Sequence, residues 1–308
     1  MKTTGNVTYL PRCAKRLRMP EPSTPPEGSR LRAQRAGANV HVRPAPVRIE
    51  LLTDPWSVWC WGFEPVRRAL ELRYPTVQFR PLLGGMFPEM PDPKAMDFDV
   101  DRFFSIVQRT TGMPIRRVED AQRPESTYPA CVHVHAAKIL DPKKEVPFLR
   151  AMREAVYLDG LNISRPDVAA QVAQRVGLDP EAYRGVLESG AADDAFRQRI
   201  GELHAQELHA YPTLLFKWGD RAARVDGFQT LPAVLGLAQS LSGRKHAPLP
   251  DPAIETVIPA GERVATREVA EVFGMSLERA FERLTEAEKS GTLVRQRHPS
   301  GDVWSRAA

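Results

Sequence analysis

Ser57 and Cys60 are the two residues whose types and spacing point most directly to chemistry. An apolar run at residues 47–52 predicts a strand before them, and residues 60–73 predict a helix that starts at the pair. Two cysteines at such a helix start exchange disulfides, because the unpaired N–H groups of the first turn stabilise a thiolate. Here a serine occupies the first position, and its hydroxyl cannot serve as a thiolate. The segment therefore predicts a degenerate Ser-x-x-Cys redox site.

The role of Cys60 stays open on sequence grounds. One turn into the helix, its thiol would feel a weaker helix field, and burial would raise its pKa. The plain alternative is that Cys60 is a small buried apolar residue. If the thiol is active, the protein would be a thiol-disulfide oxidoreductase with Ser57 and Cys60 as its catalytic residues. Cys131 is then a candidate second thiol, provided that the segment carrying it folds over the site with suitable geometry.

Three tryptophans, Trp56, Trp59 and Trp61, surround the pair. Aromatic side chains often anchor protein partners in desolvated pockets, and core packing is the alternative role. We expect Trp61 to lie in the core, and we expect Trp56 and Trp59 to be more exposed. Trp56 and Trp59 are therefore candidate substrate-binding residues.

A second group of reactive side chains, Cys131, His133 and His135, invites interpretation as a metal site. On a helix, Cys131 and His135 share a face while His133 points elsewhere. Two ligands are too few for a zinc site without remote partners, so we predict a structural role and no metal. The sequence also shows no Gly-rich phosphate loop and no convincing Ser-His-Asp order.

Charge divides the 308-residue chain into two parts. Residues 1–46 carry nine basic side chains, two acidic ones and seven prolines, which predicts a disordered basic tail. The formal charge of the whole chain is +5, so residues 47–308 are slightly acidic, and we expect no nucleic-acid binding. No apolar run approaches the roughly 20 residues of a membrane span, and the start lacks the apolar core of a signal peptide. We therefore expect a cytoplasmic protein that binds no membrane.

The elements that must position the pair follow in a simple order. Residues 47–83 predict a strand–helix–strand unit with a parallel strand pair. A helical insertion is expected at about residues 97–208, because this region lacks the alternation of strands. The sheet resumes at residues 211–218 and 223–225 and is followed by a helix at residues 231–241.

The C-terminal part predicts a small module of its own. Residues 244–255 have the composition of a linker, and residues 256–308 predict two helices and a two-stranded hairpin, a winged-helix-like pattern. Thr266 is a candidate N-cap for the first helix. The second helix mixes acidic and basic side chains, whereas a helix that reads DNA would be more basic. We therefore expect this module to contact protein or simply to pack on the rest of the chain.

Two motifs carry a family resemblance: Asp54-Pro55-x-Ser57-x-x-Cys60-Trp61-Gly62-Phe63 and Tyr211-Pro212-Thr213-Leu214. Together with the helical insertion, they resemble the DsbA-like branch of thioredoxin-fold proteins over about residues 47–243. The resemblance implies an α/β thioredoxin-like fold in which Pro212 is a cis-proline facing the redox site, and a trans proline at a strand edge is the alternative. It also implies that the backbone groups of Tyr211 pair with an extended peptide. Tyr211, Pro212 and Thr213 are therefore candidate substrate-binding residues.

The C-terminal part adds a narrower resemblance. Cytosolic adaptors of this branch, which deliver the regulator Spx to the ClpXP protease, have a similar insertion and a similar C-terminal helix, here at residues 264–273. The resemblance implies adaptor-like binding of a protein or thiol client, with no resident cofactor. Two enzymatic alternatives stay open. Cys60 could exchange disulfides with glutathione or Cys131, and Ser57 could hold the thiolate of glutathione, as in the similar kappa-class transferases and 2-hydroxychromene-2-carboxylate isomerases.

Overall fold

The computed structural model describes residues 45–92 and 99–307 of the chain. The predicted disordered tail, except for its last two residues, lies outside the described residues. No helix among the described residues has both the length and the apolar character that a membrane span needs.

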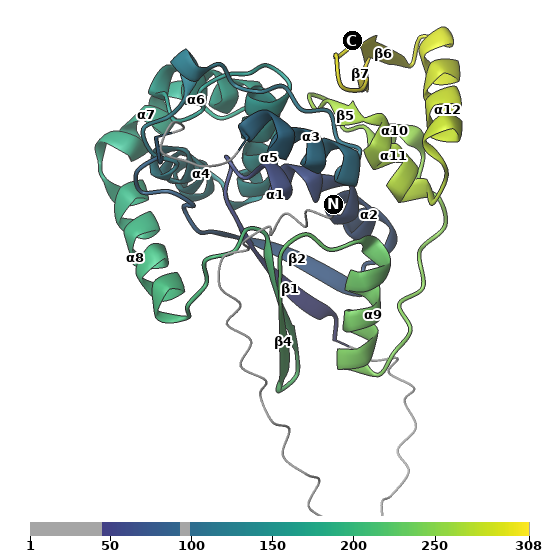
Figure 1. Cartoon of the computed structure of the whole chain (residues 1–308), viewed down its shortest axis with the longest axis horizontal. Coiled ribbons are helices and arrows are strands. Elements are labelled where there is room, and N and C mark those ends of the chain that lie inside the picture. Colours follow the sequence, from purple (N-terminus) through teal and green to yellow (C-terminus); the bar gives the residue numbers. More distant parts are fainter. Residues whose placement is uncertain (1–44, 93–98, 308) are drawn as a thin grey trace, which may run out of the picture. The chain divides into compact units, whose positions relative to one another are not determined.

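A four-stranded sheet in the order β2-β1-β3-β4 forms the centre of the fold (Figure 1). Its strands are β1 (Val47–Thr53), β2 (Val77–Leu83), β3 (Thr213–Trp218) and β4 (Arg221–Asp226). β1 and β2 are parallel, with Val47 opposite Val77, and β3 runs antiparallel to both β1 and β4. A parallel pair needs a crossover connection, and two helices between β1 and β2 provide it.

The crossover differs from the single helix predicted at residues 60–73. The structure contains α1 (Val58–Gly62) and α2 (Glu64–Arg73), which meet at Phe63. Pro65 lies in the first turn of α2, where its missing N–H group costs nothing and its fixed φ favours a new helix start. The break leaves α1 as a short helix that begins directly after Ser57.

Side chains of β1 alternate between two faces of the sheet, as expected for a strand. Val47, Ile49 and Leu51 pack with Phe63 and Leu70 in a core that also contains side chains of α9 (Leu231–Ser242). Leu52 belongs to a smaller cluster with Leu82, Leu203 and Leu208.

The segment between β2 and β3 is helical, as predicted. It contains α3 (Val100–Thr111), η1 (Asp120–Gln122), α4 (Tyr128–Leu140), η2 (Pro142–Lys144), α5 (Glu145–Tyr157), α6 (Pro166–Arg175), α7 (Pro180–Glu188) and α8 (Ala191–Ala205). Its core includes Val134 of α4, Phe148 and Met152 of α5, Tyr183 of α7 and Phe196 of α8. The same cluster includes Trp61, so the insertion packs directly on the helix that carries Cys60.

The C-terminal part is docked on the rest of the described chain. It contains α10 (Ile254–Val257), β5 (Val264–Ala265), α11 (Thr266–Phe273), α12 (Leu277–Lys289), β6 (Leu293–Gln296) and β7 (Val303–Arg306). Its strands form a three-stranded sheet in the order β5-β7-β6, one strand more than predicted, because Val264 pairs with Trp304. Figure 1 shows α11 beside α2, and Ala69 of α2 lies in one buried cluster with Val269 and Trp304.

The connecting segment and the start of α11 differ from their predicted roles as a linker and a helix cap, because both contact residues that are distant in sequence. Leu249, in the predicted linker, donates its N–H to the carbonyl of Arg73, and the Arg73 Nε donates to the Leu249 carbonyl. The predicted cap Thr266 is already the first residue of α11, and its hydroxyl instead accepts a bond from Trp304 Nε1. The Glu268 side chain caps the helix by accepting a bond from the N–H of Ala265.

Candidate functional site

The loop between β1 and α1 is shaped by Asp54. Its Oδ1 accepts a 2.7 Å bond from the N–H of Trp56, and its carbonyl accepts a 3.1 Å bond from the N–H of Ser57. This turn delivers Ser57 to the N-cap position of α1, where its Oγ accepts a 3.3 Å bond from the N–H of Cys60. The serine thus takes the predicted place at the helix start, and one of its functions there is to cap the helix.

The carboxylate of Asp54 also joins three segments that are distant in sequence. Its Oδ2 accepts bonds from the N–H of Met86 at 2.6 Å and from the hydroxyl of Thr127 at 3.0 Å. Asp54 is completely buried, and burial raises the pKa of its carboxyl although these hydrogen bonds oppose the rise. Met86 and Thr127 were not identified from the sequence, because nothing local marks them as partners of Asp54.

Cys60 is buried, with 1% of its surface exposed. Burial raises the pKa of its thiol above the ordinary value, while the positive charge of Arg153 and hydrogen bonds from its neighbours act in the opposite direction. A thiol with a raised pKa is protonated at neutral pH and is a weak nucleophile.

Cys131 lies on α4 and is also fully buried. Its Sγ is 3.7 Å from Oδ2 of Asp54, and burial together with that carboxylate raises the pKa of the thiol well above its usual range. Both cysteines are free thiols in this structure. The structure thus brings Cys131 to the residue that shapes the Ser57 loop.

The turn before β3 approaches the same region. The Tyr211–Pro212 peptide bond is cis. The Tyr211 hydroxyl donates a 3.3 Å bond to the carbonyl of Gly85, and a Cβ atom on Gly84 would collide with the Tyr211 ring. Thr213 is fully buried, and its hydroxyl contacts the carbonyl of Ala210 and the carboxylate of Asp226, each at 2.8 Å. Its side chain therefore supports the turn.

An apolar cavity of about 270 Å³ adjoins the site, and both Ser57 and Tyr211 line it. Aromatic and thioether side chains form a large part of its wall, among them Trp56, Trp59, Met86, Met90, Phe103 and Phe104. Arg117, Asp120 and Arg123 add charged groups to this wall. Cavities that are mostly apolar with a few polar groups are typical of binding sites.

The three tryptophans occupy different environments. Trp61 is completely buried, donates a 2.8 Å bond to the carbonyl of Pro114 and stacks on Tyr157. Trp56 and Trp59 are partly buried and line the cavity. Trp56 is held by a 3.0 Å bond from its Nε1 to the hydroxyl of Ser164, so its ring is fixed before any ligand binds.

Two residues of α5 hold the loop from behind, and the sequence did not reveal them. Arg153 donates hydrogen bonds to the hydroxyl of Thr53 and to Glu64. Tyr157 donates a 2.6 Å bond to the carbonyl of Trp56. Arginine and tyrosine are ordinary residues on a helix, and only tertiary packing places them behind the loop.

The two histidines of α4 are buried among other side chains of the insertion. His133 Nδ1 lies 2.8 Å from the hydroxyl of Tyr183, and burial lowers the pKa of His133 to about 4. Burial likewise lowers the pKa of His135 to about 4. Within residues 45–92 and 99–307, no three His, Cys, Asp or Glu side chains are grouped as metal ligands.

Comparison with known proteins places the chain among thioredoxin-fold proteins. The thioredoxin family model matches residues 51–232. The chain is similar to the protein named ClpXP adapter protein SpxH of Halalkalibacterium halodurans, with 25% identity over 251 residues, covering 78% of this chain and 82% of the relative. The SpxH protein of Bacillus subtilis is 24% identical over 275 residues, which cover 87% of this chain and 92% of the relative.

Two solved structures share the fold over part of the chain. A putative protein disulfide isomerase from Nitrosomonas europaea superimposes with a TM-score of 0.55 at 20% identity, covering 64% of this chain and 96% of that chain. The cytosolic disulfide reductase DsbM from Pseudomonas aeruginosa has a TM-score of 0.53 at 20% identity, covering 64% of this chain and 100% of that chain. The predicted thioredoxin-like α/β fold is thereby confirmed, and the chain belongs to the thioredoxin family whose model it matches.

Proposed function

We propose that this protein is an adaptor that binds a protein client at the groove between the Ser57 loop and the Tyr211–Pro212 turn. The observation that carries the proposal is the apolar cavity beside a helix start whose attacking sulfur is replaced by a hydroxyl. A client segment would place an apolar side chain against Trp56 and Trp59. Binding of this kind needs no thiolate and no resident cofactor.

The backbone at the turn supports the binding of an extended segment. The carbonyl of Pro212 is already bonded to the N–H of Gly227, so the turn is tied to the end of β4. The backbone groups of Tyr211 precede β3 at the edge of the cavity, where an extended peptide can pair with them. Backbone pairing would give affinity, and the aromatic cavity would select the side chain.

The relatives supply the class of client. Both SpxH proteins described above are named as ClpXP adapters, and they match most of this chain. Combined with the resemblance to cytosolic adaptors, this favours a client that is presented to the ClpXP protease in the cytoplasm. The C-terminal part completes the likeness, and we retain the interpretation of residues 256–308 as a winged-helix-like module that contacts protein and no nucleic acid.

A reconstituted degradation assay tests the proposal. Purified Spx and ClpXP of Bacillus subtilis serve as the probe, and the loss of Spx is followed with and without this protein. We expect the protein to bind Spx and to accelerate its degradation. Trp59→Ala should weaken Spx binding by about 10-fold or more, because aromatic anchors in desolvated pockets carry much of the binding energy.

Trp218→Ala is the matched control. Trp218 is a partly exposed tryptophan on β3, contacted by Arg221 and Arg244, and it does not line the cavity. Its replacement should leave Spx binding within about 2-fold of wild type. Equal losses in both variants would remove the cavity from the proposal, and a wild-type protein that neither binds Spx nor speeds its loss would refute the adaptor role.

Disulfide exchange through Cys60 is the alternative with a direct test. Ser57→Cys adds the missing sulfur, and we expect the introduced thiol and Cys60 to form a reducible couple, seen as a gel shift after thiol labelling. In the wild type, the buried Cys60 should label slowly. Fast labelling together with Cys60-dependent reduction of glutathione mixed disulfides would instead support the enzyme.

Glutathione held by Ser57 is the second alternative, favoured by the serine's place on the cavity wall. Its hydroxyl is at a helix N-terminus, where it could donate to a thiolate. A thermal shift with glutathione that disappears in Ser57→Ala would support this ligand. No shift at millimolar glutathione would leave the protein client as the better proposal.

A further inference from the structure

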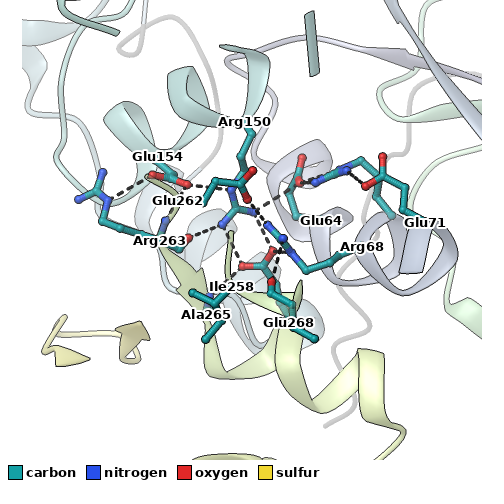
Figure 2. Close-up of polar contacts among 12 residues, drawn as sticks. Glu64, Arg68, Glu71, Arg150, Glu154, Ile258, Glu262, Arg263, Ala265 and Glu268 are labelled. Carbon is teal, nitrogen blue, oxygen red and sulfur yellow. Dashed lines mark hydrogen bonds and ion pairs between the residues drawn. The ribbon is translucent and has the colours of Figure 1, made fainter. Parts of the chain in front are cut away.

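A buried charge network joins the C-terminal part to the back of the Ser57 loop. We define it as Glu64 and Arg68 of α2, Arg150, Arg153 and Glu154 of α5, and Glu268 of α11. All six residues are buried. Figure 2 shows the carboxylate of Glu268 directed toward Arg150 and Arg68, with Arg150 also reaching Glu154.

Glu268 is the end of the network that belongs to the C-terminal part. Its two oxygens accept bonds from Nη1 and Nη2 of Arg150 at 2.8 and 2.9 Å, and Oε1 accepts a further 3.0 Å bond from Nε of Arg68. Oε2 also accepts the N–H of Ala265 at 2.8 Å. With no exposed surface and these four bonds, this carboxylate has one favourable position.

Arg150 is the central link. Its Nε donates to Glu154 at 3.0 Å, its Nη1 lies 3.4 Å from Glu64, and its Nη2 donates to the carbonyl of Arg263 at 2.6 Å. The guanidinium also lies 4.6 Å from the ring centre of Trp61, on the helix that carries Cys60. One side chain thus contacts α1, α2, α5 and the C-terminal part.

Glu64 and Arg153 carry the network to the loop. Glu64 accepts bonds from Arg67 at 2.8 Å and from Arg153. Arg153 then contacts the hydroxyl of Thr53 and, at 3.5 Å, the carbonyl of Asp54. These contacts end on the residue that shapes the turn before Ser57.

The side chains of the buried charge network depend on one another for their positions, because each charge needs its partner. A buried charge that loses its partner cannot be rescued by water, so its neighbours move or pair again. Removing the charge of Glu268 would leave Arg150 and Arg68 underpaired. Arg150 would then be drawn further toward Glu64, which also pairs with Arg153.

We propose that Glu268 and Arg150 are positioning residues for the Ser57 loop, so that the C-terminal part holds the binding site through the buried charge network. This proposal does not depend on the identity of a client or on the adaptor role. Its readout is the shielding of Cys60, which is a property of the protein alone.

The experiment measures how fast Cys60 is alkylated in the folded full-length protein. N-ethylmaleimide is the probe, and mass spectrometry of the peptide that contains Cys60 gives the rate separately from the other cysteines. In Glu268→Gln we expect the Cys60 rate to rise by about 10-fold, because the loop opens more often. The matched control Glu271→Gln removes a carboxylate from the same helix that pairs only with Arg267 among the described residues, and its rate should stay within about 2-fold of wild type.

Two further variants separate positioning from general loss of stability. Leu284→Ala creates a cavity in the C-terminal core, whose Leu284 is fully buried, without touching the network. It should lower stability in urea with little change in the Cys60 rate measured without urea. If Glu268→Gln and Leu284→Ala raise the rate in proportion to their loss of stability, the proposal is wrong.

The combination with Glu64→Gln tests the route. Glu268 and Glu64 share Arg150, so the double variant should react no faster than Glu64→Gln alone. If the increases in the Cys60 rate caused by the two single substitutions multiply in the double variant, the two residues act independently and the proposal is overturned. An unchanged rate in Glu268→Gln would overturn it as well. Should Glu268→Gln fail to fold, Glu268→Asp serves instead, because it keeps the charge and shortens its reach. Its Cys60 rate should lie above that of wild type, and a wild-type rate would again refute the proposal.

Discussion

The cavity beside Ser57 is lined mostly by partly buried side chains and the interface between α2, α5 and α11 by fully buried ones, and their chemistry is opposite. The cavity wall is largely apolar and rich in aromatic and thioether side chains, and the thiols near it have raised pKa values. The interface is filled with guanidinium and carboxylate groups that satisfy one another. Covering an open apolar surface with a partner is favourable, whereas separating paired buried charges costs free energy. The first region suits reversible binding and the second suits a permanent joint.

The strongest test of the comparison is Arg150→Met. Methionine leaves Glu268, Glu154 and Glu64 without their shared cation, so the free energy of unfolding should fall by about 3–5 kcal/mol. Urea denaturation followed by circular dichroism measures the change. Arg184→Met is the control, since Arg184 pairs with Glu181 on the exposed surface and should cost at most about 1 kcal/mol. Similar losses in the two variants would contradict the distinction drawn for the interface.

Acid should separate the interface from the helical insertion, which contributes part of the cavity wall and also carries His133, by the pH at which each loses stability. Burial lowers the pKa of His133 to about 4 in the folded protein, against about 6.5 in the unfolded chain. The unfolded chain therefore binds the proton first, and stability that is complete above pH 6.5 is lost as the pH falls toward 4, by about 3 kcal/mol. In His133→Gln, the free energy of unfolding, measured in urea, should change less steeply between pH 6.5 and pH 4 than in wild type. An unchanged pH dependence would exclude His133 as its source.

The interface should respond only at lower pH. Burial by itself would raise the pKa of the Glu64 carboxyl, but Arg67, Arg153 and Arg150 outweigh burial and hold this pKa well below its usual range. Its contribution is therefore complete above about pH 4.3 and is lost as the pH falls further. Urea titrations at pH 3 to 5 should show this loss in the wild type and a weaker one in Glu64→Gln.

The smallest expected effects come from two glycines. Gly84 lies against the Tyr211 ring and Leu52, so the Cβ of Gly84→Ala would displace the turn and cost about 1–3 kcal/mol. Gly236 lies inside α9 with open space around its Cα, so Gly236→Ala should stabilise the protein by about 0.5–1 kcal/mol. Thermal unfolding shows both shifts, and a stabilising Gly84→Ala would mean that the turn is looser than the geometry indicates.

Local patterns predicted the elements of the site well. Alternating apolar residues predicted β1, and the helix start at Ser57 followed from the residues around it. Predictions from local patterns were wrong where a residue distant in sequence bonds the group in question. Thr266 looked like a helix cap, yet its hydroxyl bonds Trp304 and Glu268 performs the capping.

The partners of the site could not be predicted, because their signal is not local. Thr127 and Met86 contact Asp54 through bonds that span 73 and 32 residues of sequence, and neither stands in a recognisable motif. Arg153 is one of several arginines on the helices of the insertion. Only its contacts with Thr53 and Glu64 in the folded chain distinguish it.

The amino-acid sequence by itself determined which atoms are available: a hydroxyl at position 57, a lone sulfur three residues later and tryptophans around them. Which side chain stands at each position is set by the covalent chain, and folding does not change it. The tertiary structure alone decided that Cys60 is buried, that Cys131 approaches Asp54 and that Glu268 meets Arg150. Burial and charge pairing depend on groups brought together from distant parts of the chain, and these set the pKa values and the rigidity of the site.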